Sequence, residues 1–411
     1  MLNICYLNIS NKSSTTGVDR YLSILIKGIT KYAPSAKITF LDFTYNNEIL
    51  FPRYCEDNNY KRVVIPLPQR YSNILNKPYW MDKYFETVIT ILQPHLEVDM
   101  LYHVNSSNLI PLALKLKQNL QGKIISHVHL IPWKEYYEWN RAQFNKLYAQ
   151  HIAGNRAEKF YVNAREKDFY KKADKIICVT KIGKEFVHKV AQIHQNRIIN
   201  IMNGIEDLLP DNFIRRGDSN TITILFAGRV CEGKGIFFVL DSLKIVKNKG
   251  YDFKFVIAGA CGDDTKRTIL NKYPNLNIDI LGNINFSTLE KLYLSSDIGV
   301  IPSLKEQASY VAIEMAMYGL PIVCTAVDGL DEIFTDRLNA LKVDTLFSKL
   351  SGLTIDVEMM ANKIITLMKN KKLRISMGKN IRILYEQELS SCRMIQSTLE
   401  IYKEINQMKT S

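Results

Sequence analysis

The 411-residue sequence has little that would anchor it in a membrane or carry it out of the cell. It contains no apolar run near the roughly 20 residues that span a bilayer, and its start, MLNICYLNIS, lacks the basic region of a signal peptide. The seven cysteines are scattered and form no C-x-x-C pair, which favours a reducing compartment. We therefore expect a cytoplasmic protein, soluble or peripheral on the inner face of the membrane.

Acidic residues are also in short supply. The chain has 41 Asp and Glu against 54 Lys and Arg, a net charge of +13. Such a surplus favours anionic partners, namely nucleotide diphosphates, acidic lipid head groups or nucleic acid, although solubility alone would also account for it. No Asp-x-Asp motif stands at the end of an expected strand. We therefore expect neither a metal nor another cofactor.

The length exceeds the size at which a single hydrophobic core stops growing, so we expect two domains. Short apolar runs alternate with helical or loop segments, which predicts parallel, doubly wound α/β sheets. The runs are residues 2–9, 38–41, 63–65, 100–104, 123–128, 175–179 and 198–202 in the first half, and 223–227, 253–258, 278–281, 298–301 and 321–325 in the second. Beyond Leu341 the pattern predicts helices, at 357–369, 372–384 and 390–408.

The stretch 298–332 predicts a strand, a loop, a helix and a second strand. Its loop places Glu306 at the crevice where open α/β sheets bind ligands. The helix, residues 308–318, offers free N–H groups and a positive dipole end to a phosphate. Glu314 lies eight residues after Glu306, roughly two helical turns beyond the helix start.

The loop GRVCEGKG follows the strand at 223–227. Gly228, Gly233 and Lys234 satisfy the G-x4-G-K pattern of a phosphate-binding loop. Gly235 stands where nucleoside triphosphatases need Ser or Thr to hold magnesium, which counts against an ATPase. Arg229 and Lys234 instead supply two cations, which can stabilise the charge that develops on a departing diphosphate.

Together, Glu-x7-Glu within EQASYVAIEM and GR-x4-KG within GRVCEGKG resemble the motifs of the family 4 retaining glycosyltransferases, within glycosyltransferase group 1. The sequence EQASYVAIEM is most similar to that of a Bacteroides-type subgroup of these enzymes. The resemblance implies the α/β GT-B fold, in which two Rossmann-like, doubly wound domains face each other across a cleft. It places an acceptor-side domain at 1–205, a nucleotide-sugar domain at 206–385, and a last helix, 386–411, packed back on the first domain.

The resemblance also implies roles for individual residues. Arg229 and Lys234 would stabilise the diphosphate, Glu306 would orient the donor sugar, and Glu314 would hold the ribose. His129, at a strand end, would lie near the donor sugar, whereas His127 is expected to alternate to the opposite face and point into packing. The predicted catalytic residues are Arg229, Lys234, Glu306 and His129, and the donor-binding residues are Gly17, Gly228, Arg229, Lys234, Gly282, Ile284, Glu306, Ala308, Ser309, Tyr310, Val311 and Glu314.

Three positions depart from glycines of the family pattern: Ser309 replaces a single glycine, Asp328 replaces the first of two glycines, and Thr16 replaces the first of another pair, before Gly17. The implied function is transfer of a hexose from a nucleotide diphosphate donor to an acceptor hydroxyl with retention, in surface glycan or glycoconjugate biosynthesis. The acceptor would be a glycan, a lipid-linked sugar or a peptide. A GT-B nucleotide-sugar epimerase and a non-catalytic sugar-nucleotide-binding subunit remain as alternatives.

Residues 134–197 contain fourteen Lys and Arg against seven Asp and Glu, interleaved with aromatic residues such as Trp139, Tyr148 and Tyr161. This pattern is compatible with nucleic acid, a membrane surface, an acceptor glycan or a solvated helical face. We expect no nucleic acid partner. We predict that the segment holds the first domain against an anionic membrane surface.

Overall fold

The structure, a computed structural model, describes residues 2–10, 17–45, 49, 51–67, 78–153, 164–210 and 221–407. The chain divides into two compact units. The first unit comprises residues 1–132, 156–203 and 391–411, and the second comprises 133–155 and 204–390. This division differs from the predicted domain boundaries at residues 133–155, which pack with the second unit although they were expected in the first.

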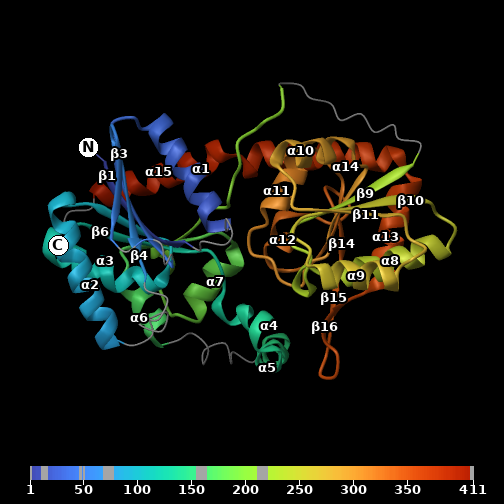
Figure 1. Ribbon diagram of the computed structural model, residues 1–411, viewed down its shortest axis with the longest axis horizontal. Helices are drawn as coiled ribbons and strands as arrows, with labels where there is room; N and C mark the ends of the chain where they lie inside the picture. Colours follow the sequence, from blue (N-terminus) through green and yellow to red (C-terminus); the bar gives the residue numbers. More distant parts are fainter. Residues whose placement is uncertain are drawn as a thin grey trace. The chain divides into compact units, whose positions relative to one another are not determined.

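The first unit is built on a sheet with strand order β3-β4-β2-β1-β5-β6-β7-β8. All neighbouring strands in it run parallel except β3 and β4. Figure 1 shows α1 and α15 on one face of this sheet and α2 and α3 on the other. The elements are β1 (Asn3–Ser10), α1 (Gly17–Tyr32), β2 (Lys37–Thr44), β3 (Arg53–Asp57), β4 (Tyr60–Pro66), α2 (Pro78–Leu92), β5 (Leu101–Val104), α3 (Ile110–Leu120), β6 (Lys123–Val128), α6 (Ala164–Lys172), β7 (Lys175–Cys178), α7 (Lys181–Lys189), β8 (Ile198–Asn200) and α15 (Ser391–Gln407).

The second unit is built on a parallel sheet with strand order β11-β10-β9-β12-β13-β14. Figure 1 shows α8 and α9 on one side of it and α10 and α14 on the other. The elements are α4 (Tyr136–Trp139), α5 (Arg141–Ile152), β9 (Ile222–Ala227), α8 (Ile236–Asn248), β10 (Phe253–Ala258), α9 (Asp263–Lys272), β11 (Ile278–Gly282), α10 (Phe286–Ser295), β12 (Ile298–Ile301), α11 (Tyr310–Met317), β13 (Ile322–Thr325), α12 (Asp328–Ile333), β14 (Leu341–Val343), β15 (Thr345–Ser348), β16 (Gly352–Ile355), α13 (Val357–Lys369) and α14 (Lys371–Leu384).

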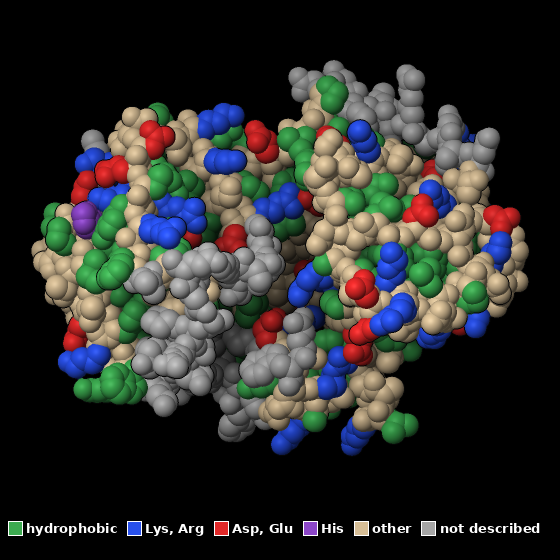
Figure 2. Space-filling model, viewed as in Figure 1, with side chains coloured by type: hydrophobic (Ala, Val, Ile, Leu, Met, Phe, Trp, Pro, Cys, Tyr) green, Lys and Arg blue, Asp and Glu red, His purple; other side chains and the backbone are tan. Residues whose placement is uncertain are grey.

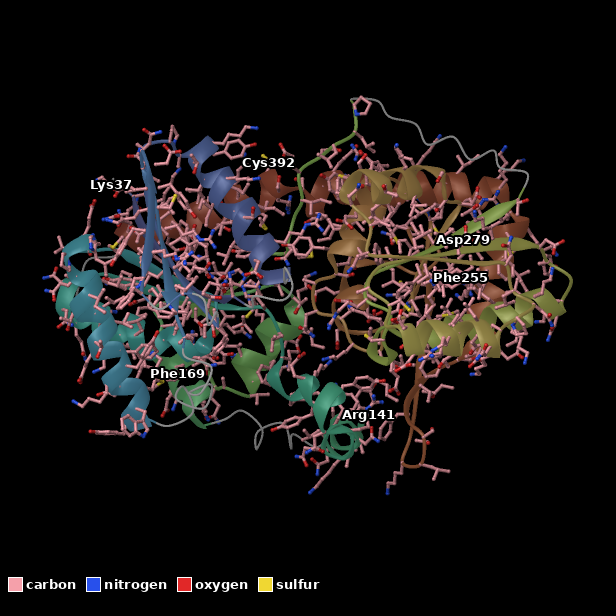
Figure 3. The ribbon with its side chains drawn as sticks, viewed as in Figure 1. Lys37, Arg141, Phe169, Phe255, Asp279 and Cys392 are labelled. Carbon is pink, nitrogen blue, oxygen red and sulfur yellow. The ribbon has the colours of Figure 1, made fainter. Side chains whose placement is uncertain are left out.

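The central strands of both sheets are buried along their length, as parallel strands between two helix layers must be. All four residues of β5, β7, β12 and β13 are buried. Phe255, labelled in Figure 3, is a fully buried side chain of β10. This double burial is why the strands read as unbroken apolar runs in the sequence.

The region after Leu341 was predicted as helical, and this was wrong at its start. It first forms β14 and then the antiparallel hairpin of β15 and β16. β14 has only three residues, and β15 has no buried residue, so neither of these two strands carries a strong apolar pattern.

The last helix, α15, begins at Ser391 and packs on α1 within the first unit. A Cβ at Gly28 of α1 would lie 2.0 Å from a side-chain carbon of Ile395, so the glycine allows the two helices to approach closely. Tyr402 of the same helix is fully buried in this unit. Among the described helices, none is both long enough and apolar enough to cross a membrane.

Candidate functional site

The strand order of the second unit reverses between β9 and β12. The chain continues from β9 to β10 and β11 on one side, then returns to β12 and continues to β13 and β14 on the other. Loops at the carboxyl ends of two such strands leave in opposite directions and open a crevice, which is where open α/β sheets bind ligands. The GRVCEGKG loop follows β9 and the loop with Glu306 follows β12, so both predicted motifs meet at this point.

The two loops are tightly joined. The Leu304 N–H donates to the Gly233 carbonyl at 3.0 Å. Gly235 has a φ of 72°, and a Cβ there would lie only 1.7 Å from the Pro302 carbonyl oxygen. Glycine is therefore required at position 235 for both backbone conformation and space. This packing explains why the residue that a triphosphatase would use for magnesium is a glycine here.

Lys234 and Glu306 form an ion pair at the centre of the site. Lys234 ends a 3₁₀ turn, Glu232–Lys234, and the Ser303 hydroxyl also donates to Glu306 Oε2 at 3.3 Å. Burial acts to lower the pKa of Lys234, but the charge and hydrogen bond of Glu306 outweigh it and raise that pKa. Lys234 therefore stays a cation, while its neighbour Arg229 is exposed.

The backbone of Glu306 is held by the turn of Asp328 and Gly329. The Gly329 N–H donates to the Glu306 carbonyl at 2.8 Å, and the Glu306 N–H donates to Asp328 Oδ2 at 3.4 Å. The Asp328 side chain is only 7% exposed and forms an ion pair with Lys134, which the sequence separates from it by 194 residues. Its carboxylate is therefore part of the support of the site.

Helix α11 begins beside this loop. Ser309 is its N-cap residue, and its hydroxyl accepts a hydrogen bond from the Ala312 N–H at 3.3 Å. Ser309 and Tyr310 are buried, whereas Ala308 and Val311 are half-buried. The serine that replaces the family glycine thus occupies one N–H group of the first turn.

Glu314 lies on α11 and is only 2% exposed. Its Oε2 accepts a hydrogen bond from the Tyr293 hydroxyl at 2.6 Å, and the ring of Tyr293 stacks on that of Tyr318 with centroids 5.3 Å apart. The predicted ribose contact of Glu314 is untested. Its partner Tyr293, on α10, has no signature in the sequence that would have identified it.

Gly282 is the last residue of β11, which lies two strands away from β9, and Ile284 follows it. The Gly259 N–H donates to the Gly282 carbonyl at 2.8 Å, and the Gly228 N–H donates to the Ala258 carbonyl at 2.8 Å. These bonds tie the ends of β9, β10 and β11 together. The predicted nucleobase contact around Gly282 and Ile284 stays a prediction.

His129 and Gly17, the other predicted residues, belong to the first unit. Gly17 begins α1, and residues 11–16 of its loop lie outside the described residues. The strand order of this unit reverses between β1 and β5. Asn105, directly after β5, has its Oδ1 3.0 Å from His129 Nε2. Because an amide oxygen only accepts, this contact puts the proton of His129 on Nε2 and leaves Nδ1 as an acceptor.

The expectation for His127 was wrong in one respect. Its ring stacks on that of His129, with centroids 4.1 Å apart and planes 10° apart, because residues two apart along a strand point to the same side. His127 is nevertheless buried, as expected. Its Nδ1 lies 3.0 Å from His103 Nε2, and His103 Nδ1 is hydrogen-bonded to the Tyr402 hydroxyl of α15.

This buried stack is electrically neutral. Burial, together with the nearby charge of His129, lowers the pKa of His103 to about 3. Burial and the charges of both other rings lower the pKa of His127 well below its ordinary value. Burial also lowers the pKa of His129. The three rings therefore form an uncharged support under the strand end that carries His129.

The second unit matches a known family. Residues 211–383 match the family model described as glycosyl transferases group 1. An uncharacterised glycosyltransferase of Methanocaldococcus jannaschii is 27% identical over 270 residues, which cover 64% of this chain and 70% of that protein. The capsular polysaccharide biosynthesis glycosyltransferase CapM of Staphylococcus aureus is 27% identical over 194 residues, 45% of this chain and 44% of its own length.

Solved structures share the fold of the whole chain at low sequence identity. Sucrose-phosphate synthase from Thermosynechococcus elongatus has a TM-score of 0.73 and 16% identity, covering 98% of this chain and 99% of its own. HepE from Anabaena, in complex with UDP-glucose, has a TM-score of 0.66 and 13% identity, covering 98% and 100%. These likenesses confirm the predicted GT-B fold class. The group 1 assignment is supported, whereas the retaining family 4 and the Bacteroides-type subgroup stay predictions.

Proposed function

We propose that this chain, whose residues 211–383 match the family model of group 1 glycosyl transferases, transfers a hexose from a nucleoside diphosphate donor to an acceptor hydroxyl. The ion pair of Lys234 and Glu306 carries the proposal. It joins a cation suited to a diphosphate and a carboxylate suited to sugar hydroxyls at the strand-order reversal of the second unit. HepE, a structural neighbour, is solved with UDP-glucose, which supports a nucleotide sugar as the donor.

The proposed mechanism begins with an exchange of partners. When the donor diphosphate enters, Lys234 turns from Glu306 to the phosphate oxygens, and Glu306 becomes free to accept hydrogen bonds from the sugar. Arg229, exposed on the same loop, supplies the second positive charge. As the bond from sugar to phosphate breaks, these two charges stabilise the departing diphosphate. We nominate no general base, because in the retaining reaction that we propose the departing phosphate assists the acceptor proton.

The remaining predicted residues complete the donor site in this proposal. Glu314 holds the ribose, the amides of residues 308–310 face phosphate, and the backbone from Gly282 to Ile284 meets the base. His129 and Gly17 belong to the first unit, and their predicted roles toward the donor stay predictions. No metal is needed, because the two cations neutralise the diphosphate.

The test is incubation of the purified protein with a panel of nucleotide sugars, with and without acceptor hydroxyl compounds and chelator. Released nucleoside diphosphate supports transfer or hydrolysis, an isomerised donor indicates the epimerase, and no turnover with retained nucleotide binding indicates a non-catalytic subunit. Glu306→Gln should reduce turnover and leave nucleotide affinity unchanged. Activity that chelator abolishes and magnesium or manganese restores would contradict the metal-free mechanism.

The name of the CapM relative supports surface glycan or glycoconjugate biosynthesis as the pathway. The acceptor would then be a glycan, a lipid-linked sugar or a peptide, reached from the cytoplasm. On the face of the second unit drawn in Figure 2, Lys and Arg side chains are interspersed with Asp and Glu. We assign membrane contact to the first unit because two adjacent lysines, Lys171 and Lys172, are exposed at the end of α6.

Each basic residue near an anionic leaflet contributes about 1 kcal/mol to binding. Lys171→Glu combined with Lys172→Glu should therefore reduce co-sedimentation with anionic vesicles at 0.1 M salt, whereas Lys146→Glu, an exposed position of α5 in the second unit, should not. Binding should also fall as salt rises to about 1 M, where the Debye length is about 3 Å. Equal recovery with neutral vesicles would contradict the electrostatic contact.

A further inference from the structure

The ion pair of Lys134 and Asp328 is unusually well buried. The two side chains are only 9% and 7% exposed. Asp328 has a φ of 42°, a left-handed conformation that glycine adopts readily and that asparagine and aspartate tolerate better than most other residues. Burial, in contrast, does not favour a charged aspartate. Its carboxylate must therefore be stabilised by the groups around it, which are Lys134 and the Glu306 N–H.

The turn of Asp328 and Gly329 hydrogen-bonds both backbone groups of Glu306, its N–H and its carbonyl. One oxygen of Asp328 accepts the Glu306 N–H, and the Gly329 N–H binds the Glu306 carbonyl. A Cβ at Gly329 would lie 1.7 Å from the Gln307 carbonyl oxygen, so the two segments are in direct backbone contact. Any shift of Asp328 is therefore transmitted to the carboxylate that faces Lys234.

Lys134 belongs to residues 133–152, which pack with the second unit. This segment reaches the site loops through two further ion pairs, Glu135 with Lys305 at 3.0 Å and Arg141 with Glu232 at 3.4 Å. Arg141, labelled in Figure 3, also lies over the ring of Tyr137 at 3.5 Å from its centroid. The segment thus contacts the loops after β9, β12 and β13, each once through a charge pair.

We propose that Lys134 is a positioning residue of the donor site, which acts through Asp328 on Glu306. The proposal rests on the proposed function only for its effect on turnover. Without Lys134, the buried Asp328 carboxylate would be uncompensated. It would then move toward solvent and release the Glu306 N–H, so that Glu306 loses its fixed distance to Lys234. If the charge of Asp328 is removed as well, no uncompensated buried carboxylate is left, and residue 328 is expected to keep its position.

The variants that test this are Lys134→Met, Asp328→Asn and the double variant. Asparagine keeps an acceptor oxygen for the Glu306 N–H and tolerates the left-handed backbone. Lys254→Met is the control, because Lys254 forms a surface pair with Asp279 at 2.7 Å with both side chains about half exposed. Asp279 is labelled in Figure 3.

Hydrogen exchange of the apoprotein measures the stability of the hydrogen bonds between the Asp328–Gly329 turn and Glu306, and it needs no donor. Lys134→Met should speed exchange of the Glu306 and Gly329 amides by about tenfold, within the range of pairwise couplings between buried neighbours. Exchange in β10 should not change, and the double variant should return most of the protection. Unchanged exchange in Lys134→Met, or a double variant as unprotected as the single one, would overturn the proposal.

Kinetics with whichever donor the nucleotide-sugar panel identifies give the second readout. Lys134→Met should lower kcat about tenfold with little change in KM, because the nucleotide contacts lie elsewhere, and the double variant should recover most of the loss. If the wild-type protein turns over no donor, the proposed function fails, and hydrogen exchange alone still decides whether Lys134 positions Glu306.

Discussion

Acidification should destabilise the first unit through its buried histidines. His103 is fully buried and His127 is 5% exposed. The pKa of His103 is lowered to about 3, and that of His127 is also well below its ordinary value. Both rings are therefore neutral in the folded protein at pH 5, whereas an unfolded histidine, with a pKa near 6.5, is mostly protonated there. The unfolded state then binds more protons, so stability is greatest above about pH 6.5 and falls as the pH is lowered.

The loss of unfolding free energy depends only on the pKa of histidine in the unfolded state, as long as the buried rings stay neutral in the folded protein. From pH 6.5 to pH 5 is 1.5 units, which corresponds to about 2 kcal/mol for each histidine and about 4 kcal/mol for the pair. The pKa of His129 is also lowered to about 3, so this ring adds about 2 kcal/mol and the total is about 6 kcal/mol. This is a large fraction of the stability of an ordinary domain. Carboxylates contribute little in this window, because their ordinary pKa values lie below it.

Native-state hydrogen exchange of β5 and β6 measures the opening free energy of the first unit without the second. The difference between pH 7.5 and pH 5 should be about 6 kcal/mol in the wild-type protein and about 4 kcal/mol in His103→Phe. The variant loses the bond to Tyr402 at both pH values, so this cost cancels in the difference. The control is His95→Gln, since His95 is exposed. If the difference in opening free energy between pH 7.5 and pH 5 is the same in His103→Phe as in the wild-type protein, the reasoning is refuted.

Three further predictions concern the donor site. Lys234→Ala and Arg229→Ala should each lower turnover about 100-fold or more, the scale of one preorganised electrostatic group, and steady-state kinetics of the folded variants will test this. Glu314→Ala should weaken nucleotide binding in calorimetry and lower the melting temperature, because it leaves a buried tyrosine hydroxyl without its acceptor. Gly235→Ala should weaken donor binding, and it should lower the melting temperature more than Gly250→Ala does. Both glycines have a positive φ, but of the two only Gly235 lies against another backbone segment. Equal decreases in melting temperature would mean that backbone strain alone matters.

The features predicted best from the sequence are those that a short, continuous segment determines by itself. Parallel strands buried on both faces leave apolar runs, and the runs that end at Ala227 and Ile301 were placed within a residue of β9 and β12. The loops after them carried charged residues, Lys234 and Glu306, and strand order brings these together. Local pattern was sufficient here because each motif lies wholly within one loop next to one strand.

Contacts between distant segments left no such pattern. In the sequence, Asp328 was notable only because it replaces a glycine of the family pattern. No residue near it indicated that Lys134, 194 residues earlier, is its partner. The stacking of His127 and His129 was missed through the wrong face assignment, and the further contact with Tyr402 depends on how the last helix packs. A compensating pair of this kind becomes visible only when both positions are placed in space.

The basic segment 134–197 illustrates why a local charge count is a poor guide to a surface. It was predicted to hold the first domain against an anionic surface, but the structure divides the segment between two units near residue 155. Lys134 and Lys175 are ion-paired, with Asp328 and Glu404, and Tyr148 packs against Phe347 with ring centroids 5.1 Å apart. Trp139 and Tyr161 fall outside the described side chains. A charge surplus attracts a membrane only to the extent that the charges are unpaired and face the same way. In the first part of this segment the cations Lys134 and Arg141 instead meet the carboxylates of the site loops, so part of the surplus stabilises the protein's own structure.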